Sequence, residues 1–439
     1  MPSSSTLAPP AEPTVAPGHD LLPQYRAVRS LSERLCDTLV PEDYVVQSMP
    51  DVSPTKWHLA HTSWFFETFL LRPNLPNYCS LHPQYEFLFN SYYNSLGARH
   101  CRPKRGLISR PTVADTYAYR AYVDEHMEAL LEGANEERLS RLTPLVAVGL
   151  HHEQQHQELM VTDIKHVFSE NPLRPVYRDR RTEVPAEAPP LTWAEFPEQL
   201  AWIGHDGNGF AFDNEGPRHR EFVPAFALAS RLVTCGEYQT FMEDGGYARP
   251  EFWLSEGWAT VQARGWQAPL YWERQDGRWW QFTLSGMRPV EEAEPVCHLS
   301  LFEADAYAHW AGRQWPGARL PTEFEWEVAA RGLPWAGNFV EGGLFHPAAA
   351  PPAPPHALTQ MFGDVWEWTR SQYSPYPGYA PPAGALGEYN GKFMCNQFVL
   401  RGGSCATSQT HIRDTYRNFF PPDARWQFMG LRLARDAAS

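Results

Sequence analysis

The sequence predicts an α+β protein of two domains, an N-terminal four-helix bundle followed by a mixed, loop-rich domain. Three observations predict this class. The 439 residues exceed the size at which one hydrophobic core usually keeps growing. Residues 20–171 repeat apolar side chains at three- and four-residue steps, as amphipathic helices do. After about Leu200, short apolar runs alternate with Gly, Pro and Asp, which is typical of short strands and turns.

Four long helices are expected in the first domain. They cover "DLLPQYRAVRSLSERLCDTL", "SPTKWHLAHTSWFFETFLL", "TVADTYAYRAYVDEHMEALLEG" and "TPLVAVGLHHEQQHQELMVTDIKHVF". We expect Ser53 to cap the second helix and Gly133 to end the third. Thr143-Pro144 is expected to open the fourth, because proline is favoured at the first helical position. Four such helices joined by loops favour a bundle.

The segments between these helices divide the chain further. Residues 72–111 are too long for a turn and are rich in Tyr, Phe and Arg, which favours a functional loop. Residues 1–19 are predicted to be a disordered tail and residues 172–195 a linker, so that the second domain covers residues 196–439. Helices are expected there at "SLFEADAYAHWAGRQ" and "TEFEWEVAARG".

Composition excludes several classes of protein. The formal net charge of −14 repels nucleic acid and anionic membranes. Seven cysteines without a dense framework indicate reduced thiols, and no stretch has the apolar length of a membrane span. We therefore expect a cytoplasmic protein with small-molecule substrates, no nucleic-acid partner and no membrane; composition leaves the oligomeric state open.

A candidate metal site lies on the fourth predicted helix. His152-Glu153-Gln154-Gln155-His156 matches H-E-x-x-H, the zinc-peptidase motif. Any helix with His at positions i and i+4 aims both imidazoles at one point, so that the motif alone does not choose the metal. The second helix independently places His61 on its apolar face, and bundle cores are where facing helices build metal sites.

Several alternatives stay open at this level. His58 is a rival ligand, although a supporting role beside a ligand is favoured. Glu153 and Glu158 either orient imidazoles or are charges on the helix surface. The zinc-peptidase hypothesis lacks the expected downstream ligand, since no H-x-x-G-x-x-H follows His156. A non-catalytic, lectin-like binding module on an inert bundle is a further hypothesis.

The motifs resemble those of a known family. "SPTKWHLAHTSWFFE" followed by "HHEQQHQE" resembles the DinB-like bundle of the sulfoxide synthases of ergothioneine biosynthesis. "RLPTEFEWEVAARG", "GDVWEWT", "VLRGGSC" and "GLRLAR" look like the formylglycine-generating-enzyme fold, a relative of C-type lectins. The positions of that enzyme's two copper-binding cysteines look like Thr407 and Ile412 here, so that no soft copper site is expected.

The resemblance implies an Fe(II) enzyme that uses O2 to join a thiol to C2 of the imidazole of hercynine, leaving a sulfoxide. The implied metal ligands are His61, His152 and His156. A synthase of the ovothiol class, which acts on histidine, is the alternative within this chemistry. The thiol donor is cysteine or γ-glutamylcysteine, and cysteine is favoured.

The resemblance also implies roles around the metal. Tyr93, slightly favoured over Tyr92, is expected to supply a proton or hydrogen atom that steers the reaction toward carbon–sulfur bond formation. Some members of the family take this tyrosine from the second domain, in the region that matches residues 385–389. That region looks depleted in this sequence, so we do not expect the catalytic tyrosine there. Gln155 is expected to hydrogen-bond the substrate imidazole.

The remaining candidates are expected to bind substrate groups. Arg102 and Arg105 resemble the pair that holds the donor carboxylate, which suits a guanidinium fork. For hercynine, Asn418 is expected to take the carboxylate. Three aromatic residues are expected to face the trimethylammonium group, namely Tyr416, Phe419 and Phe420.

Overall fold

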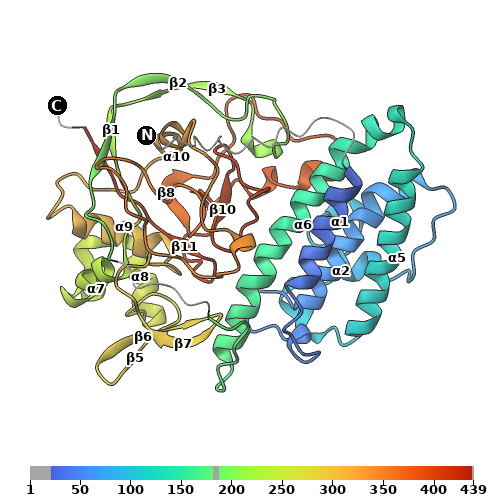
Figure 1. Ribbon diagram of the computed structural model, residues 1–439, viewed down its shortest axis with the longest axis horizontal. Coiled ribbons are helices and arrows are strands. Elements are labelled where there is room, and N and C mark those ends of the chain that lie inside the picture. The colour runs from blue at the N-terminus through green and yellow to red at the C-terminus, as the bar shows by residue number, and fades with distance from the viewer. Residues whose placement is uncertain (1–20, 181–186, 438–439) are drawn as a thin grey trace, which may run out of the picture.

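The computed structural model describes residues 21–180 and 187–437. The predicted tail (1–19) and the middle of the predicted linker (181–186) lie outside the described residues. Figure 1 shows two lobes, a helical bundle and a mixed domain. The bundle consists of α1 (Leu21–Arg34), α2 (Thr55–Phe66), α5 (Val113–Glu132) and α6 (Glu136–Glu170). No helix among the described residues is both long enough and apolar enough to cross a bilayer.

Two predicted helix starts were wrong, and both have local reasons. Pro54, not Ser53, is the N-cap of α2, and the Ser53 hydroxyl instead accepts a hydrogen bond from Arg105. Helix α6 begins at Glu136, with the Asn135 side chain as its cap, and Pro144 lies inside the helix. Proline costs one i→i−4 hydrogen bond there, but the 35-residue helix is held along its length by tertiary packing. The predicted stop at Gly133 is confirmed.

A glycine allows α6 to approach α2 closely. A Cβ atom on Gly149 would lie 2.6 Å from the ring of Phe66, closer than real Cβ atoms approach carbon. Gly149 therefore gives the clearance that lets these helices pack together, one turn before His152.

The connection between α2 and α5 carries several short elements. Helix α2 continues through a π-turn at Glu67–Leu71 into α3 (Arg72–Asn74). The loop then contains α4 (Tyr85–Phe89), η3 (Asn94–Leu96) and η4 (Arg102–Leu107). This connection is thus ordered rather than a simple turn, as the functional interpretation requires.

The second domain is built from four small sheets. Their strand orders are β1-β4-β12, β2-β3, β5-β6-β7 and β10-β9-β8-β11. Only the β11–β8 pairing is parallel among the pairings of the described strands. The strands are β1 (Trp193–Phe196), β2 (Gln199–Ile203), β3 (His219–Val223), β4 (Phe226–Ala229), β5 (Trp272–Gln275), β6 (Arg278–Thr283), β7 (Gly286–Pro289), β8 (Trp366–Gln372), β9 (Phe398–Arg401), β10 (Asn418–Phe420), β11 (Met429–Gly430) and β12 (Ala434–Asp436).

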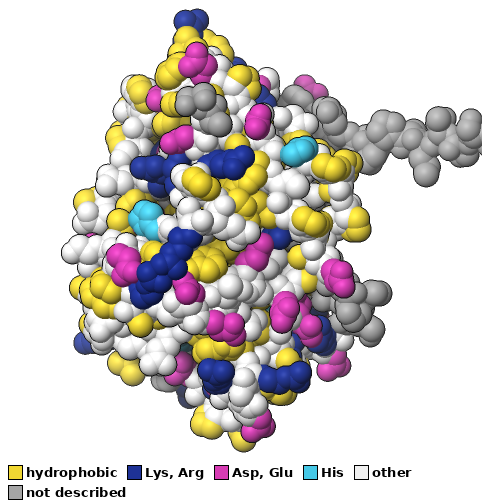
Figure 2. Space-filling view, turned by 90° about the vertical axis from the view of Figure 1, so that its left-hand side faces the viewer, with side chains coloured by type: hydrophobic (Ala, Val, Ile, Leu, Met, Phe, Trp, Pro, Cys, Tyr) yellow, Lys and Arg dark blue, Asp and Glu magenta, His cyan; other side chains and the backbone are white. Residues whose placement is uncertain are grey.

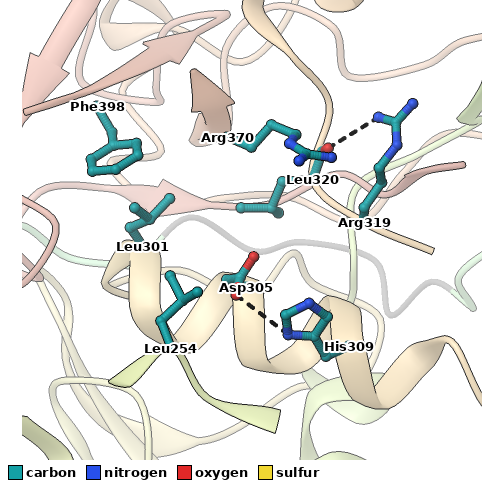
Figure 3. Close-up of a pocket in the computed structure, with 8 residues that line it drawn as sticks. All are labelled: Leu254, Leu301, Asp305, His309, Arg319, Leu320, Arg370 and Phe398. Atoms are coloured by element: carbon teal, nitrogen blue, oxygen red, sulfur yellow. Dashed lines mark hydrogen bonds and ion pairs between the residues drawn. The ribbon is translucent and has the colours of Figure 1, made fainter. Parts of the chain in front are cut away.

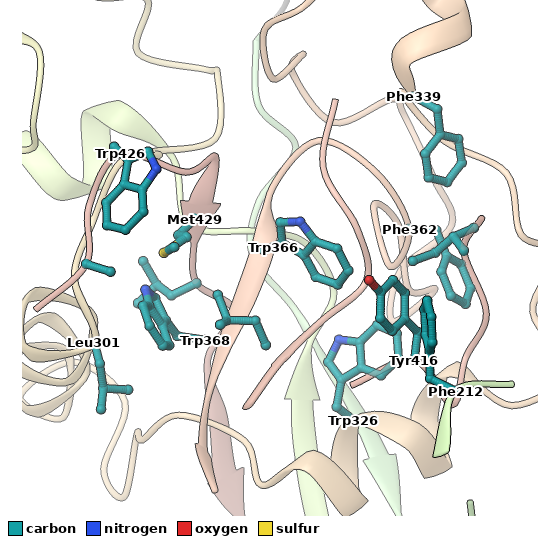
Figure 4. Packing of buried hydrophobic residues seen from close by; sticks show 14 of the residues in the cluster. Phe212, Leu301, Trp326, Phe339, Phe362, Trp366, Trp368, Tyr416, Trp426 and Met429 are labelled. Carbon is teal, nitrogen blue, oxygen red and sulfur yellow. The ribbon is translucent and has the colours of Figure 1, made fainter. Parts of the chain in front are cut away.

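Four helices pack around these sheets. The two predicted ones are α9 (Leu301–Ala311) and α10 (Glu323–Ala330), each opened by a capping box from Ser300 or Thr322. Sequence reasoning missed α7 (Cys235–Glu243) and α8 (Ser255–Arg264). The hydrophobic core of the second domain is rich in tryptophan. Figure 4 shows Trp326, Trp366, Trp368 and Trp426 around Met429 and Tyr416.

Helix α6 joins the two domains through buried polar contacts. The Glu158 carboxylate accepts hydrogen bonds from Trp366 Nε1 (2.7 Å), Ser404 Oγ (2.5 Å) and Thr407 Oγ1 (2.9 Å). Glu158 therefore neither orients an imidazole nor lies on the surface, which corrects both expectations. Thr407, at a position expected to have lost a copper ligand, instead anchors the bundle to the second domain.

Candidate active site

Three histidines from two helices converge at the centre of the bundle. His61 comes from α2, and His152 and His156 lie one turn apart on α6. Their ligand nitrogens all lie within 4.8 Å of one another, and all three residues are buried. The Nε2 atoms of His61 and His152 are 3.2 Å apart. Two nitrogens at right angles on one metal ion would be separated by about 3 Å, so the spacing suits a shared ion.

Hydrogen bonds fix which nitrogen of His61 faces the cluster. The Nδ1 atom lies 2.5 Å from the carbonyl oxygen of Phe89. A carbonyl only accepts, so Nδ1 carries the proton in the neutral ring and Nε2 keeps its lone pair. This lone pair faces His152, as a metal ligand requires.

A second chain of hydrogen bonds fixes His156. His58 Nε2 lies 3.0 Å from an Asp163 carboxylate oxygen, and His58 Nδ1 lies 2.8 Å from His156 Nδ1. The carboxylate accepts from His58 Nε2–H, so His58 Nδ1 accepts from His156 Nδ1–H, which leaves His156 Nε2 free. Both nitrogens of His58 thus have partners within the protein. This favours His58 as a residue that orients the ligand His156 over His58 as a ligand itself.

Burial keeps the three rings in the neutral form that binds metals. Burial lowers the pKa of His152 to about 3. Burial first, and the neighbouring histidines next, lower the pKa values of His61 and His156 well below the usual range. The rings are thus unprotonated at neutral pH, as metal ligation requires.

Aromatic rings lock the imidazoles in place. His61 stacks between Trp57, 4.6 Å away between ring centroids, and Trp64 at 5.4 Å. Phe65 lies 4.4 Å from His152. These residues form the apolar stripe that the sequence predicts for α2, and they leave the imidazoles little room to rotate.

Glu153 does not face the cluster, although it belongs to the peptidase motif. Its carboxylate accepts hydrogen bonds from Arg120 of α5 (2.6 Å) and from Arg29 (2.9 Å) and Ser32 (2.6 Å) of α1. Despite burial, which raises it, Arg120 and Arg29 lower the pKa of Glu153 to about 2. A carboxylate so strongly held cannot serve as a general base for metal-bound water, which argues against the zinc peptidase and corrects both roles expected for Glu153.

The tyrosine pair of the long loop lies beside the cluster. Tyr93 is fully buried, and its ring packs 5.7 Å from Trp64, which stacks on His61. The Tyr93 hydroxyl has no hydrogen-bond partner among the described residues. Tyr92 packs 4.8 Å from Tyr93 and faces the second domain. The unsatisfied hydroxyl of Tyr93 is therefore available to a bound substrate.

Sequence reasoning missed a third tyrosine, Tyr389. The region 385–389 was interpreted as depleted, yet the Tyr389 ring lies 5.8 Å from that of His152. Its hydroxyl donates to Gln155 Oε1 over 2.5 Å. The sequence offered one signal for this tyrosine, its presence within residues 385–389. No local pattern links it to the metal site, because Tyr389 and His156 are 233 positions apart in the chain.

Gln155 connects the bundle to the second domain. Its Nε2 donates to the Tyr416 hydroxyl over 2.7 Å. The Tyr416 hydroxyl in turn lies 3.1 Å from His411 Nε2. Phe212, another residue that sequence reasoning missed, stacks 5.3 Å from Tyr389 and lies 5.6 Å from Tyr416. Gln155 thus lies at the edge of an aromatic wall contributed by the second domain.

The two predicted arginines have different environments. Arg105 is buried, lies 3.3 Å above the centre of the Trp57 ring, and donates hydrogen bonds to the hydroxyls of Ser53 and Ser91. Its Nε atom has no hydrogen-bond partner in the part of the chain that the structure describes. Burial and the nearby Arg102 lower the pKa of Arg105. Arg102 itself is exposed and donates to the Asp51 carbonyl. Arg105 is thus a buried cation whose site suits an added carboxylate.

The predicted residues of β10 are only partly brought to the site. Phe419 stacks on Tyr373 and lies 5.9 Å from Phe393, which contacts Tyr92. The Asn418 side-chain oxygen accepts from the backbone N–H of Phe419. Phe420 instead packs on Trp426, and its strand partner Phe398 lines a different cavity.

That cavity is separate from the histidine cluster. It holds about 270 Å³ and is lined by residues of α9 together with Arg319 and Arg370 (Figure 3). Helix α9 and the bundle lie on opposite sides of β8 in Figure 1. On the outer face of the second domain, acidic and basic side chains are intermixed with hydrophobic ones (Figure 2). The candidate site is therefore the buried histidine cluster of the bundle with the second-domain residues beside it, not this outer cavity.

Comparisons with known proteins agree with this division. Residues 24–160 match the DinB superfamily, and residues 202–437, more than half of the chain, match the sulfatase-modifying factor enzyme 1-like domain. The hercynine oxygenase of Mycolicibacterium smegmatis is 33% identical over 420 residues, covering 89% of this chain and 92% of that protein. The hercynine oxygenase of Mycobacterium tuberculosis is also 33% identical, covering 88% of this chain and 92% of that protein. The formylglycine-generating enzyme of Streptomyces coelicolor is 29% identical over 276 residues, covering 53% of this chain and 84% of that protein.

Proposed function

This chain belongs to the hercynine oxygenases, iron-dependent oxygenases, and from that premise we propose that it joins the thiol of cysteine to C2 of the hercynine imidazole. One thiol, one imidazole C–H and one O2 give one sulfoxide and one water, so both oxygen atoms and both hydrogen atoms are accounted for. The observation that carries the proposal is the buried set of three imidazoles with their ligand nitrogens within 4.8 Å.

We assign the iron to His61, His152 and His156. The fit rests on the donor set, because imidazole suits iron. The hydrogen bonds that His61 donates to the Phe89 carbonyl and that His156 donates to His58 leave two of the three Nε2 lone pairs facing the centre. When bound, Fe(II) supplies O2 activation and open positions for the two substrates. The protein supplies three neutral ligands and a dry, aromatic surround.

The donor carboxylate is placed on Arg105. The Arg105 guanidinium is buried and bonds two serine hydroxyls but no carboxylate among the described residues. Such a buried cation is costly, and an incoming carboxylate would pair with it. Arg102 remains exposed in the free protein. One buried cation here can pair with one donor carboxylate, which is the number that cysteine has. γ-Glutamylcysteine has a second carboxylate that would need a further partner, so cysteine is favoured.

Hercynine is placed against the second domain. Gln155 lies between Tyr389 and Tyr416 and would exchange one of these hydrogen bonds for the imidazole nitrogen of hercynine. The rings of Tyr416, Tyr389 and Phe212 suit a trimethylammonium group, which cannot donate hydrogen bonds. Asn418 is kept as the candidate for the carboxylate of hercynine and Phe419 as a further ring for the trimethylammonium group, whereas the packing of Phe420 on Trp426 argues against Phe420.

Tyr93 is proposed as the proton or hydrogen-atom donor, with Tyr92 as its neighbour. Its hydroxyl is buried and has no hydrogen-bond partner within the described ranges, and the group is kept protonated because burial raises its pKa well above the usual value. A protonated phenol can donate where a phenolate cannot. Tyr389 is already hydrogen-bonded to Gln155, so Tyr93 is the better donor.

A substrate matrix tests the proposal. The iron-loaded protein is given histidine or hercynine, each with cysteine or γ-glutamylcysteine, under O2, and the products are identified by mass spectrometry with fragmentation to locate the ring carbon. We expect the sulfoxide of hercynine and cysteine, linked at C2. A product from histidine would instead support the ovothiol-type alternative, and peptide cleavage by zinc-loaded protein would support the peptidase.

A further inference from the structure

A short segment of the second domain lies directly on the tyrosine loop of the first. Residues 385–393, which include η9 (Ala385–Glu388) and η10 (Gly391–Phe393), pack against η3 of the loop that follows Tyr93. About 290 residues separate the two segments in sequence. Their contact is therefore a product of the way in which the two domains dock.

Glu388 makes the main polar contact. Its two carboxylate oxygens accept the backbone N–H groups of Asn94 (3.0 Å) and Ser95 (2.8 Å). The N–H of Asn94 belongs to the peptide group that links Tyr93 to Asn94. The Glu388 carboxylate therefore fixes the backbone directly after Tyr93. Charge-assisted hydrogen bonds of this kind are roughly twice as strong as neutral ones.

Lys392 completes the contact from the same segment. Its ammonium group lies 2.8 Å from Glu388 and also donates to the backbone carbonyl of Tyr92. The Phe393 ring packs edge to face on Tyr92 at 5.3 Å. The segment therefore touches the backbone on both sides of Tyr93 and the side chain of Tyr92.

The first domain holds the loop on either side of residues 94 and 95, through the Asn90 side chain before them and the hydrogen bond from His100 N–H to the Phe87 carbonyl after them. The Asn90 side chain accepts from Tyr93 N–H (3.1 Å) and donates to the Tyr93 carbonyl (2.9 Å). These bonds fix the turn before Tyr93, whereas the N–H groups of Asn94 and Ser95 are bound by Glu388 of the second domain. The second domain thus holds the two residues that directly follow Tyr93.

We propose that Glu388 is a positioning residue for Tyr93, and that docking of residues 385–393 sets whether the thiol is joined to the imidazole or only oxidised. The inference rests on the proposed function. In the productive reaction thiol, imidazole C–H and O2 give sulfoxide and water. In the competing reaction thiol and O2 give a sulfinic acid, which takes up both oxygen atoms and needs no hydrogen from Tyr93.

The test compares Glu388→Gln with a matched control, Glu237→Gln. Glu237 also accepts a backbone N–H, from Thr234, and also pairs with a cation, Arg231, and it is similarly exposed, but it lies on α7. In Glu388→Gln we expect the ratio of sulfoxide to sulfinic acid to fall roughly tenfold, the factor that a lost charge-assisted hydrogen bond gives. Glu237→Gln is expected to keep the ratio of the unaltered protein.

Two further readouts separate positioning from a general loss of structure. Hydrogen exchange of the Asn94 and Ser95 amides should accelerate in Glu388→Gln while that of α6 stays unchanged. In a Tyr93→Phe background, Glu388→Gln should change the product ratio no further, because it acts through Tyr93. An additive effect of the two substitutions, or an unaltered ratio in Glu388→Gln, overturns the inference. Absence of any sulfoxide from the unaltered protein overturns the proposed function instead.

Discussion

The Nδ1 atom of His58 lies 2.8 Å from the Nδ1 atom of His156. Since Asp163 accepts from the other nitrogen of His58, the proton between the two rings belongs to His156. Asp163 therefore determines, through one intervening imidazole, which nitrogen of His156 is free for a metal. The three residues form a chain from a buried carboxylate to the proposed iron site.

Asp163→Asn should weaken metal binding about 10- to 100-fold, as loss of such supporting contacts typically does. An asparagine amide that donates to His58 Nε2 would turn the His58 tautomer and leave the proton of His156 on Nε2. The measurement is an anaerobic titration with Fe(II) or Co(II). Asp115→Asn is the control, because it alters an exposed carboxylate that accepts hydrogen bonds from Thr112, the N-cap of α5. Equal metal affinity in both variants would refute the role of Asp163.

Tyr93→Phe should divert turnover from sulfoxide to sulfinic acid without lowering stability. The hydroxyl has no hydrogen-bond partner among the described residues, so its removal breaks no bond in the free protein. Product ratios at saturating substrates and the midpoint of thermal unfolding are the measurements. Tyr117→Phe, which removes a hydroxyl bonded to Tyr44, is the comparison. An unchanged product ratio in Tyr93→Phe would remove Tyr93 from the mechanism.

Arg105→Met should raise the KM for cysteine and the melting temperature together. Loss of a charged hydrogen bond of about 1.5–3 kcal/mol corresponds to roughly 10- to 100-fold in affinity. Removing a buried cation that lacks a carboxylate partner is expected to stabilise the free protein. Arg102→Met, at an exposed position, should have a much smaller effect on KM. A melting temperature that falls in Arg105→Met would mean that this cation has a structural role instead.

Glu153→Gln should destabilise the bundle by about 3–5 kcal/mol, because Arg29 and Arg120 would lose their buried partner. The carboxylate has a folded-state pKa of about 2 and an ordinary value of 4.5. Since the folded value is the lower one, its contribution is fully present above pH 4.5 and is lost as the pH falls toward 2. The measurement is the free energy of unfolding by denaturant, for the unaltered protein and for Glu153→Gln, between pH 7 and pH 2. The difference in this free energy should shrink as the pH falls, and a constant difference would contradict the ion-pair explanation.

The local parts of the site follow from sequence alone. The spacing of His152 and His156 puts both on one face of a helix, and the apolar stripe around His61 turns that side chain inward. Such periodicity depends on residues within a few positions of each other. For the same reason the helices of the bundle and the stop at Gly133 were predictable, whereas Pro144 misplaced the start of α6, since local propensity was overridden by packing along the helix.

Only the tertiary structure determined which residues surround the three histidines. The partners that fix the tautomers and the direction of Glu153 depend on contacts between distant segments. The same holds for Tyr389 beside His152, Phe212 beside Tyr389, and Glu388 on the tyrosine loop. Such contacts leave no periodic trace in the chain, because they arise from how the helices of the bundle pack together and from how the second domain lies against them. The sequence determined which side chains carry the chemistry of the metal site, and the packing of α6 against the second domain determined which others surround it.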